Sequence, residues 1–262
     1  MVRGDAGLQG VEWRDLLHLG GLEVAHELSL SLPWLAASSL AAAYDLYPLA
    51  LAASFLFFLT GLRQVHNAHH YALGLSRRAT EWAMFALSVA MLGSMHAVQV
   101  THLRHHRHCL GAEDVEAMSA RLPGWRAVLL GPVFPVRLHA KALSVASPRQ
   151  RRWILAELGA SIAVVLAAFA LPDVSCLRYH VAAMLLGQCL TAFFAVWTVH
   201  HGCEPDGHLA RTIRGRAKAV VTYEMFFHVE HHLFPAVPTR KLPILARRLD
   251  AVRPDLALKR VF

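Results

Sequence analysis

The stretch HVEHHLFP, from His228 to Pro235, holds three histidines that would share one face of a helix. The same kind of spacing occurs twice earlier in the chain, in HNAHH at 66–70 and HLRHH at 102–106. In each segment the first and last histidines are four positions apart, so on a helix their side chains lie side by side. Neutral imidazole is the commonest metal ligand, and it suits iron, zinc and copper. The three segments therefore predict helix faces that meet around an all-nitrogen metal site.

One further candidate ligand lies outside these segments. His200 ends the last apolar stretch, close to where the site must be, and it is favoured over its neighbour His201. His69 points beside the face that His66 and His70 share, so it is interpreted as an outer partner or a bystander. Seven others are interpreted as ordinary core or surface residues: His18, His26, His96, His108, His139, His180 and His208. The candidate ligands are His66, His70, His102, His105, His106, His200, His228, His231 and His232.

The size of this set constrains the metal. Zinc takes about four ligands, so nine imidazoles are too many for one ion and would fill two, with positions left open. The paired Glu-x-x-His motifs of carboxylate-rich di-iron bundles are absent from the chain, which has this spacing once, at Glu23 and His26. A histidine-rich site with open positions suits iron that binds oxygen. The spacing alone does not decide between iron and copper.

The composition indicates a membrane protein. Of the 262 residues 55% are hydrophobic, and four apolar stretches could span or enter a bilayer, which takes roughly 20 residues per helix, although the first is short unless residues 28–32 join it. We expect an all-α integral membrane protein with about four transmembrane helices, interfacial helices, and a cytoplasmic helical cap that holds the metal site. The four stretches are Pro33–Ala43, Pro48–Leu62, Trp153–Leu171 and Val181–Val199.

The positive charge predicts the topology. Twelve Lys and Arg residues lie in 63–152 and eleven in 211–260, and cytoplasmic loops carry such an excess. The net charge of +8 does not indicate nucleic-acid binding, because no basic stripe with interleaved aromatic residues is present. We therefore expect a single membrane domain over 1–262, made of a helical hairpin (28–62), cytoplasmic histidine segments (63–152), a second hairpin (153–199) and a cytoplasmic C-terminal segment (200–262).

Three further expectations follow from local patterns. The apolar stretch from Glu81 to Gln99 must lie in the interface or re-enter, because crossing would put the first two histidine segments on opposite sides of the membrane. The stretch from Arg121 to Arg152, which is rich in proline, is expected to be the most loop-like. Four cysteines without a CxxC pair indicate free thiols in a reducing compartment. No cleavable signal peptide is expected in 1–20.

The residues HxxxH at 66–70, HxxHH at 102–106 and HVEHHLFP at 228–235 resemble the three histidine boxes of the integral-membrane fatty acid desaturase superfamily. That superfamily also holds membrane hydroxylases and carotenoid ketolases. The similarity runs from about His66 to Leu242. It implies a four-span helical protein with a cytoplasmic cap that holds two Fe²⁺ ions. It also implies that the eight box histidines and His200 are the ligands.

The resemblance implies an oxygen-dependent desaturase that introduces a double bond into a fatty acyl chain of a membrane lipid. Electrons would come from a separate protein (a ferredoxin, a rubredoxin or cytochrome b5), because the His-Pro-Gly-Gly motif of a fused cytochrome b5 domain is absent. One alternative is a hydroxylase or ketolase acting on a lipid, carotenoid or specialised metabolite. An alternative of another class is a non-catalytic membrane protein that binds metal. The expected location is a bacterial inner membrane, with the active site on the cytoplasmic side.

The chain departs from the family pattern at Asn67, where many members have Asp or Glu, so the orienting group there carries no charge. Asp114, Glu116 and Glu230 are candidate outer partners of the histidines. The basic pairs at 240–241 and 247–248 are expected to meet anionic lipid headgroups, or else an acidic electron carrier. Three aromatic residues of the last apolar stretch either line a substrate channel or pack against their neighbours and lipid: Phe193, Phe194 and Trp197.

Overall fold

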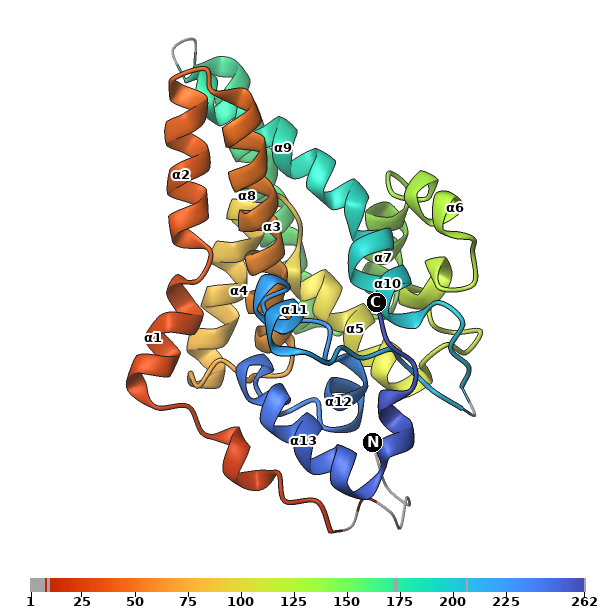
Figure 1. Ribbon diagram of the computed structural model, residues 1–262. Helices are drawn as coiled ribbons and strands as arrows, with labels where there is room; N and C mark the ends of the chain where they lie inside the picture. The colour runs from red at the N-terminus through yellow and green to blue at the C-terminus, as the bar shows by residue number, and fades with distance from the viewer. Residues whose placement is uncertain (1–7, 9, 172–173, 206, 262) are drawn as a thin grey trace.

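The computed structural model describes residues 8, 10–171, 174–205 and 207–261. Within these ranges every named element is a helix, and the β-type pairing is limited to an isolated parallel bridge between Thr212 and Arg260. Long helices rise at one end of the molecule, and short helices cluster at the other (Figure 1). The expected all-α fold is therefore confirmed.

The first hairpin consists of α2 (Leu32–Ala43) and α3 (Tyr47–His69). The helices pack closely, and Ser38 and Ser54 share a 2.6 Å hydrogen bond between them. The α3 helix is 23 residues long, whereas α2 has 12 and is separated from α1 (Gly21–Ser29) by a short break. Because a span needs about 20 residues, α2 alone is shorter than the full span expected here.

The next two helices, α4 (Arg77–Met91) and α5 (Met95–His108), meet at a bend of 112°. Leu92 ends α4 in the left-handed conformation (φ 54°), and the Ser94 side chain caps α5 by accepting a hydrogen bond from the Ala97 amide. The buried carboxylate of Glu157 holds the bend by accepting from Ser94 Oγ at 2.5 Å and from the His96 amide at 3.1 Å. The chain therefore bends sharply at this point, as in a re-entrant segment or a broken span.

The second hairpin pairs α8 (Pro148–Ala170) with α9 (Ser175–Thr191). A π-helical turn (Ala192–Trp197) continues α9 into α10 (Thr198–His200). By length and composition, three helices of the described chain could cross a membrane: α3, α8 and the continuous run Ser175–His200. The bent pair α4–α5 brings the number to four if it is counted as one span.

The expectation of a loop over 121–152 is wrong. Most of this stretch is helical, in α6 (Gly124–Leu129), α7 (Phe134–Val145) and the start of α8; the 3₁₀ turn Glu116–Ser119 lies just before it. Its prolines include Pro135 and Pro148, which lie in the first turns of α7 and α8. Proline is favoured there because the first amides of a helix have no internal partner. The prolines therefore mark helix starts here.

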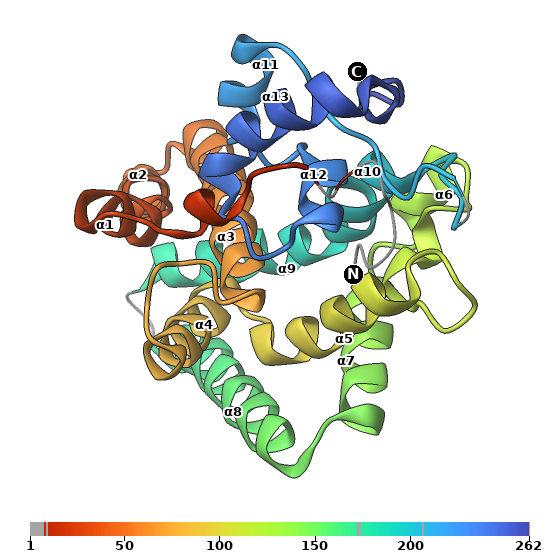
Figure 2. The same cartoon turned by 90° about the horizontal axis from the view of Figure 1, so that it is seen from below.

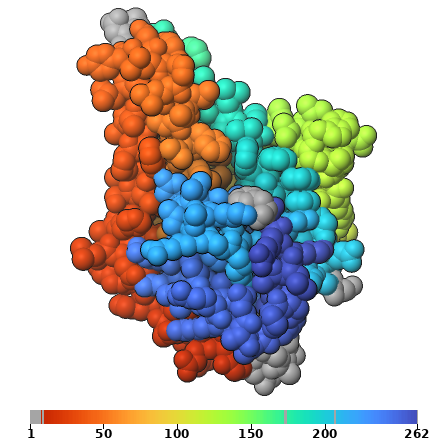
Figure 3. Space-filling view, in the orientation of Figure 1, coloured from red at the N-terminus to blue at the C-terminus, as the bar shows by residue number. Residues whose placement is uncertain are grey.

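The remaining short helices cap the long ones. They are α11 (Arg216–Val221), α12 (His228–Leu233), the 3₁₀ turn Thr239–Lys241, α13 (Leu242–Val252) and the 3₁₀ turn Pro254–Ala257. The N-terminal segment with its 3₁₀ turn Arg14–Leu17 packs on this cap, where Leu16 joins a buried cluster with Phe234 and Leu245. The space-filling view shows the N-terminal and C-terminal segments against each other at one end (Figure 3). The view from below shows the N-terminal segment beside α12 and α13 (Figure 2).

Candidate metal centre

Four histidines from three helices form a first group at the lower end of α3. His66 and His70 come from the end of α3, His102 from α5 and His231 from α12. One ring nitrogen of each lies within 4.8 Å of the others, a spacing that could hold a metal ion. The structure thus brings all three sequence segments to one point.

A second group lies beside the first. It consists of His105, His200, His228 and His232, and these side chains are all buried. His106 lies between the groups: its Nε2 is 2.8 Å from His231 Nε2, and its ring centroid is 4.4 Å from that of His232. All nine candidate ligands are therefore gathered in one cluster.

The hydrogen-bond pattern turns two ring nitrogens of the second group toward each other. His105 Nδ1 lies 2.7 Å from the Asp114 carboxylate, and His200 Nδ1 lies 2.8 Å from the Leu209 carbonyl oxygen, so each Nδ1–H donates outward. In a neutral imidazole the other nitrogen then carries a lone pair. These two Nε2 atoms face each other at 3.1 Å. Facing lone pairs repel unless a metal ion or a proton lies between them.

The spacing of the nitrogens also fits a metal. The Nε2–Nε2 distances around His200 and His228 are 3.0–3.2 Å. With metal–nitrogen bonds of about 2.0–2.1 Å, neighbouring ligands lie about 2.9–3.4 Å apart. In the first group the buried Nε2 of His66 has no hydrogen-bond partner, which a buried polar atom rarely lacks. The residues present therefore fit two metal ions.

Two carboxylates orient these histidines. Asp114 accepts from His105, and Glu116 Oε1 lies 2.9 Å from His102 Nδ1. Such partners fix the tautomer and raise the basicity of an imidazole ligand. Glu230 behaves differently, because it accepts from Thr212 Oγ1 at 2.7 Å and forms an ion pair with Arg214. Two of the three candidate outer partners therefore contact histidines, and Glu230 anchors α12 to the 212–214 segment.

Burial sets the protonation of the α12 histidines. Desolvation holds the pKa of His231 and of His232 well below the ordinary imidazole value. Both rings are therefore neutral near pH 7, which is the form that binds metal. Burial also raises the pKa of the Glu116 carboxyl to about 7.

The neighbouring histidines lie outside both groups. The His201 ring stacks on Trp197 with centroids 3.9 Å apart, and its Nδ1 donates to the Trp197 carbonyl oxygen. His69 is buried, with neither ring nitrogen hydrogen-bonded, and it borders the cavity described next. His96 pairs with Glu157 at 2.6 Å, an ordinary core contact.

An apolar cavity of about 100 Å³ adjoins the cluster. His66, His102 and His228 border it, and mostly apolar side chains of α3, α4, α5, α7, α9–α10 and the 225–226 segment form the rest of the wall. Phe194 and Ala195, from the π-helical turn, are among them. Of the other two aromatic residues, Phe193 stacks on Trp197 at 4.9 Å, so this pair packs together. The arrangement can place a hydrocarbon chain beside the histidine cluster.

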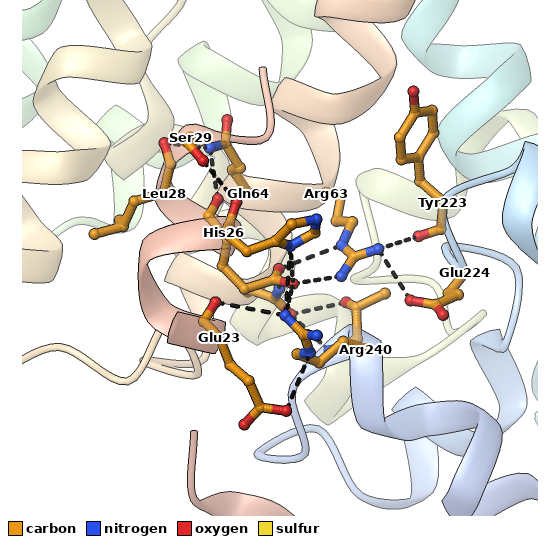
Figure 4. A network of polar contacts seen from close by, with 12 residues as sticks. Glu23, His26, Leu28, Ser29, Arg63, Gln64, Tyr223, Glu224 and Arg240 are labelled. Atoms are coloured by element: carbon orange, nitrogen blue, oxygen red, sulfur yellow. Dashed lines mark hydrogen bonds and ion pairs between the residues drawn. The ribbon is translucent and has the colours of Figure 1, made fainter. Parts of the chain in front are cut away.

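The basic residues after the third segment are held by internal ion pairs. Lys241 and Arg240 pair with Glu23 of α1, and Arg248 pairs with Asp15 at 2.7 Å. Figure 4 shows Arg240 among the acidic side chains of this network. Carboxylates of the N-terminal segment therefore neutralise part of the charge of these three residues, and their contact with lipid headgroups stays a prediction.

The sequence reasoning missed Glu27 and Arg63. Both are buried, and Arg63 Nη2 lies 2.6 Å from Glu27 Oε1. Figure 4 shows Arg63 between α1 and the 223–224 turn. The available signal was Arg63, a charge that directly follows the apolar part of its helix and that is costly to bury without a partner.

Comparison with known proteins places this centre in a family. The family model described as "Fatty acid desaturase" matches residues 39–261, and the chain belongs to that family. The chain is similar to the "Sphingolipid delta(4)-desaturase/C4-monooxygenase DES2" of Homo sapiens, with 29% identity over 200 residues that cover 70% of this chain. The Bos taurus protein of the same name is 27% identical over 202 residues. Each match spans 59% of the relative's own length.

Proposed function

We propose that this chain is an oxygen-dependent di-iron desaturase that introduces a double bond into the hydrocarbon chain of a membrane lipid. The observation that carries the proposal is the contact between the two histidine groups and one apolar cavity, which His66, His102 and His228 border. Apolar walls suit a hydrocarbon chain, and the bordering imidazoles put its carbons beside the metals. Membership of the desaturase family supports this reading.

The proposed ligands follow the two groups. His66, His70, His102 and His231 would hold one iron ion, and His105, His200, His228 and His232 the other. His106 lies between the groups and completes either set. Iron bound there supplies the activation of dioxygen. Overall, two hydrogens leave the lipid chain, and with two electrons and two protons they reduce O₂ to two water molecules.

The side chains have distinct tasks in this proposal. The apolar wall, which includes Leu62, Val65 and Ala195, holds the substrate chain and excludes water. Asp114 and Glu116 fix the tautomers of His105 and His102, so that each Nε2 lone pair points into the cluster. The electrons would come from a separate ferredoxin, rubredoxin or cytochrome b5.

The substrate class and the reaction outcome have a first candidate and a rival. The relatives are named for sphingolipid desaturation and C4-monooxygenation, so we propose a sphingolipid-type long chain as the first substrate to test. The same names favour hydroxylation as the second candidate reaction. Desaturation and hydroxylation differ in where the substrate carbon lies relative to the oxidant. Small shifts of the substrate in the cavity change that position. A carotenoid or specialised metabolite is a further substrate candidate.

The location is proposed from charge and topology. Lys and Arg are concentrated in 63–152 and 211–260, so we propose that the histidine cluster lies on the cytoplasmic side. The sequence also favours a bacterial inner membrane. The two relatives are from mammals and do not support that part of the proposal.

Mass spectrometry of the lipids from a host that expresses the chain with a redox partner tests this proposal, beside a His231→Ala control. New species lighter by two hydrogens, absent from the control, are the expected result. Species heavier by one oxygen would establish a hydroxylase. Metal binding without oxygen consumption or any new lipid, with each of the three redox partners supplied, would contradict the proposal and favour the non-catalytic alternative.

A further inference from the structure

Glu27 is a fully buried carboxylate on α1, in a segment that precedes the family match at residue 39. Its Oε1 lies 2.6 Å from Arg63 Nη2, and its Oε2 accepts from Asn67 Nδ2 at 3.1 Å. A buried charge is costly unless it is paired and hydrogen-bonded, and here both oxygens are engaged. Glu27 therefore sets the positions of two side chains on α3.

These two side chains lie on a second face of α3. Arg63 and Asn67 are four residues apart, as are His66 and His70 on the neighbouring face. Arg63 Nη1 donates to the Tyr223 carbonyl oxygen at 2.8 Å and to Glu224 Oε2 at 3.0 Å. Asn67 Oδ1 accepts from the Thr239 amide at 3.0 Å and from its hydroxyl at 2.7 Å.

These contacts bracket the third histidine segment. Tyr223 and Glu224 precede α12, and Thr239 follows it. Tyr223 and Glu224 have φ values of 50° and 62°, a left-handed conformation that L-residues adopt at a cost. Arg63 holds this strained turn, and Asn67 holds the chain on the far side of α12. The α3 face that carries Arg63 and Asn67 therefore contacts the chain on both sides of α12. The neighbouring α3 face carries the histidines that lie beside those of α12.

We propose that Glu27 is a positioning residue of the metal centre. Its carboxylate fixes the positions of Arg63 and Asn67, and these two side chains fix the position of α12 relative to α3. His231 of α12 then lies beside His66 of α3, with the two ring centroids 3.9 Å apart. We call the six residues of this arrangement the Glu27 clasp: Glu27, Arg63, Asn67, Tyr223, Glu224 and Thr239. Asn67 can be uncharged in this arrangement, because Glu27 of α1 supplies the negative charge that an Asp or Glu at position 67 would otherwise carry.

The test is iron binding by the purified full chain in detergent. Glu27→Gln keeps the shape and removes the charge. Because Glu27 acts through Arg63 and Asn67, we expect iron affinity to fall by about 10-fold, the low end for groups that contact metal ligands directly. Asn67→Asp alone sets two carboxylates against each other and should also weaken binding. In the double variant, which combines Glu27→Gln with Asn67→Asp, the amide at position 27 donates to the carboxylate at position 67. That carboxylate still accepts from Thr239. We expect the double variant to bind iron more tightly than either single variant.

The control is Asp15→Asn, which removes an exposed ion pair with Arg248 from the same N-terminal segment and should leave iron binding unchanged. Wild-type affinity in Glu27→Gln would overturn the clasp, and so would a double variant no better than the singles. The inference rests on the proposed metal centre. If the wild-type chain binds no iron, the proposed function fails, while thermal unfolding of the same variants still measures the coupling between positions 27 and 67. Absence of that coupling would overturn the clasp by itself.

Discussion

His105 Nδ1 lies 2.7 Å from Asp114 Oδ2, and both side chains are almost completely buried. The carboxylate also accepts from the Leu110 amide at 2.8 Å and from the Ala117 amide at 3.2 Å. Asp114 therefore fixes the loop after α5 and the His105 ring together. A carboxylate in this position strengthens an imidazole as a ligand.

Asp114→Asn is expected to weaken metal binding by about 10- to 100-fold, because the amide brings no charge and its NH₂ group meets donors where the carboxylate accepted. Metal titration of the purified variant measures this loss. Glu113→Gln is the matched control, since its carboxylate is exposed and holds Arg104 and Lys141 only at 3.7–3.9 Å. Equal affinities of the two variants would contradict the role of Asp114.

Ala195→Phe is expected to abolish lipid turnover and leave the metal content intact. Ala195 borders the apolar cavity, and a phenyl ring there would occupy space meant for the substrate chain. Iron analysis and lipid mass spectrometry of the same preparation separate the two effects. Ala156→Phe adds the same ring on the exposed side of α8 and should retain activity. Full activity in Ala195→Phe would show that substrate lies elsewhere.

Gly131→Ala is expected to destabilise the fold. A Cβ at this position would overlap the Cys189 backbone oxygen, so α9 and the turn before α7 must separate. Overpacking of this kind costs about 1–3 kcal/mol. Gly159→Ala on α8 has no atom within 4 Å of its new Cβ and removes a helix-weakening glycine. Thermal unfolding in detergent should rank Gly159→Ala at or above the wild type, and Gly131→Ala below it.

The histidine cluster is predictable from the sequence because helix periodicity acts locally. Histidines four apart on a helix must share a face, so spacing alone is enough to group the candidate ligands. The division into two groups is not predictable in this way. His102 joins the first group and His105 the second, although both lie on α5, because that division depends on how α3, α5 and α12 cross.

Other features depend on long-range contacts that no local pattern carries. Glu27 lies 40 positions before Asn67, and Arg63 lies 160 positions before Tyr223, so the clasp exists only after the chain has folded. The proline-rich stretch at 121–152 misleads for a different reason. Pro135 and Pro148 resemble helix breakers in the sequence, whereas each lies in the first turn of a helix.

The most direct measurement is the iron content and lipid-oxidising activity of the wild-type chain beside His231→Ala and His200→Ala. Each variant removes one imidazole from a different group, so each should lose iron from its own group and all turnover. His201→Ala is the control, because that ring stacks on Trp197 away from both groups. We expect about two irons per chain in the wild type and in the control. Full iron content and turnover in either His231→Ala or His200→Ala would contradict it.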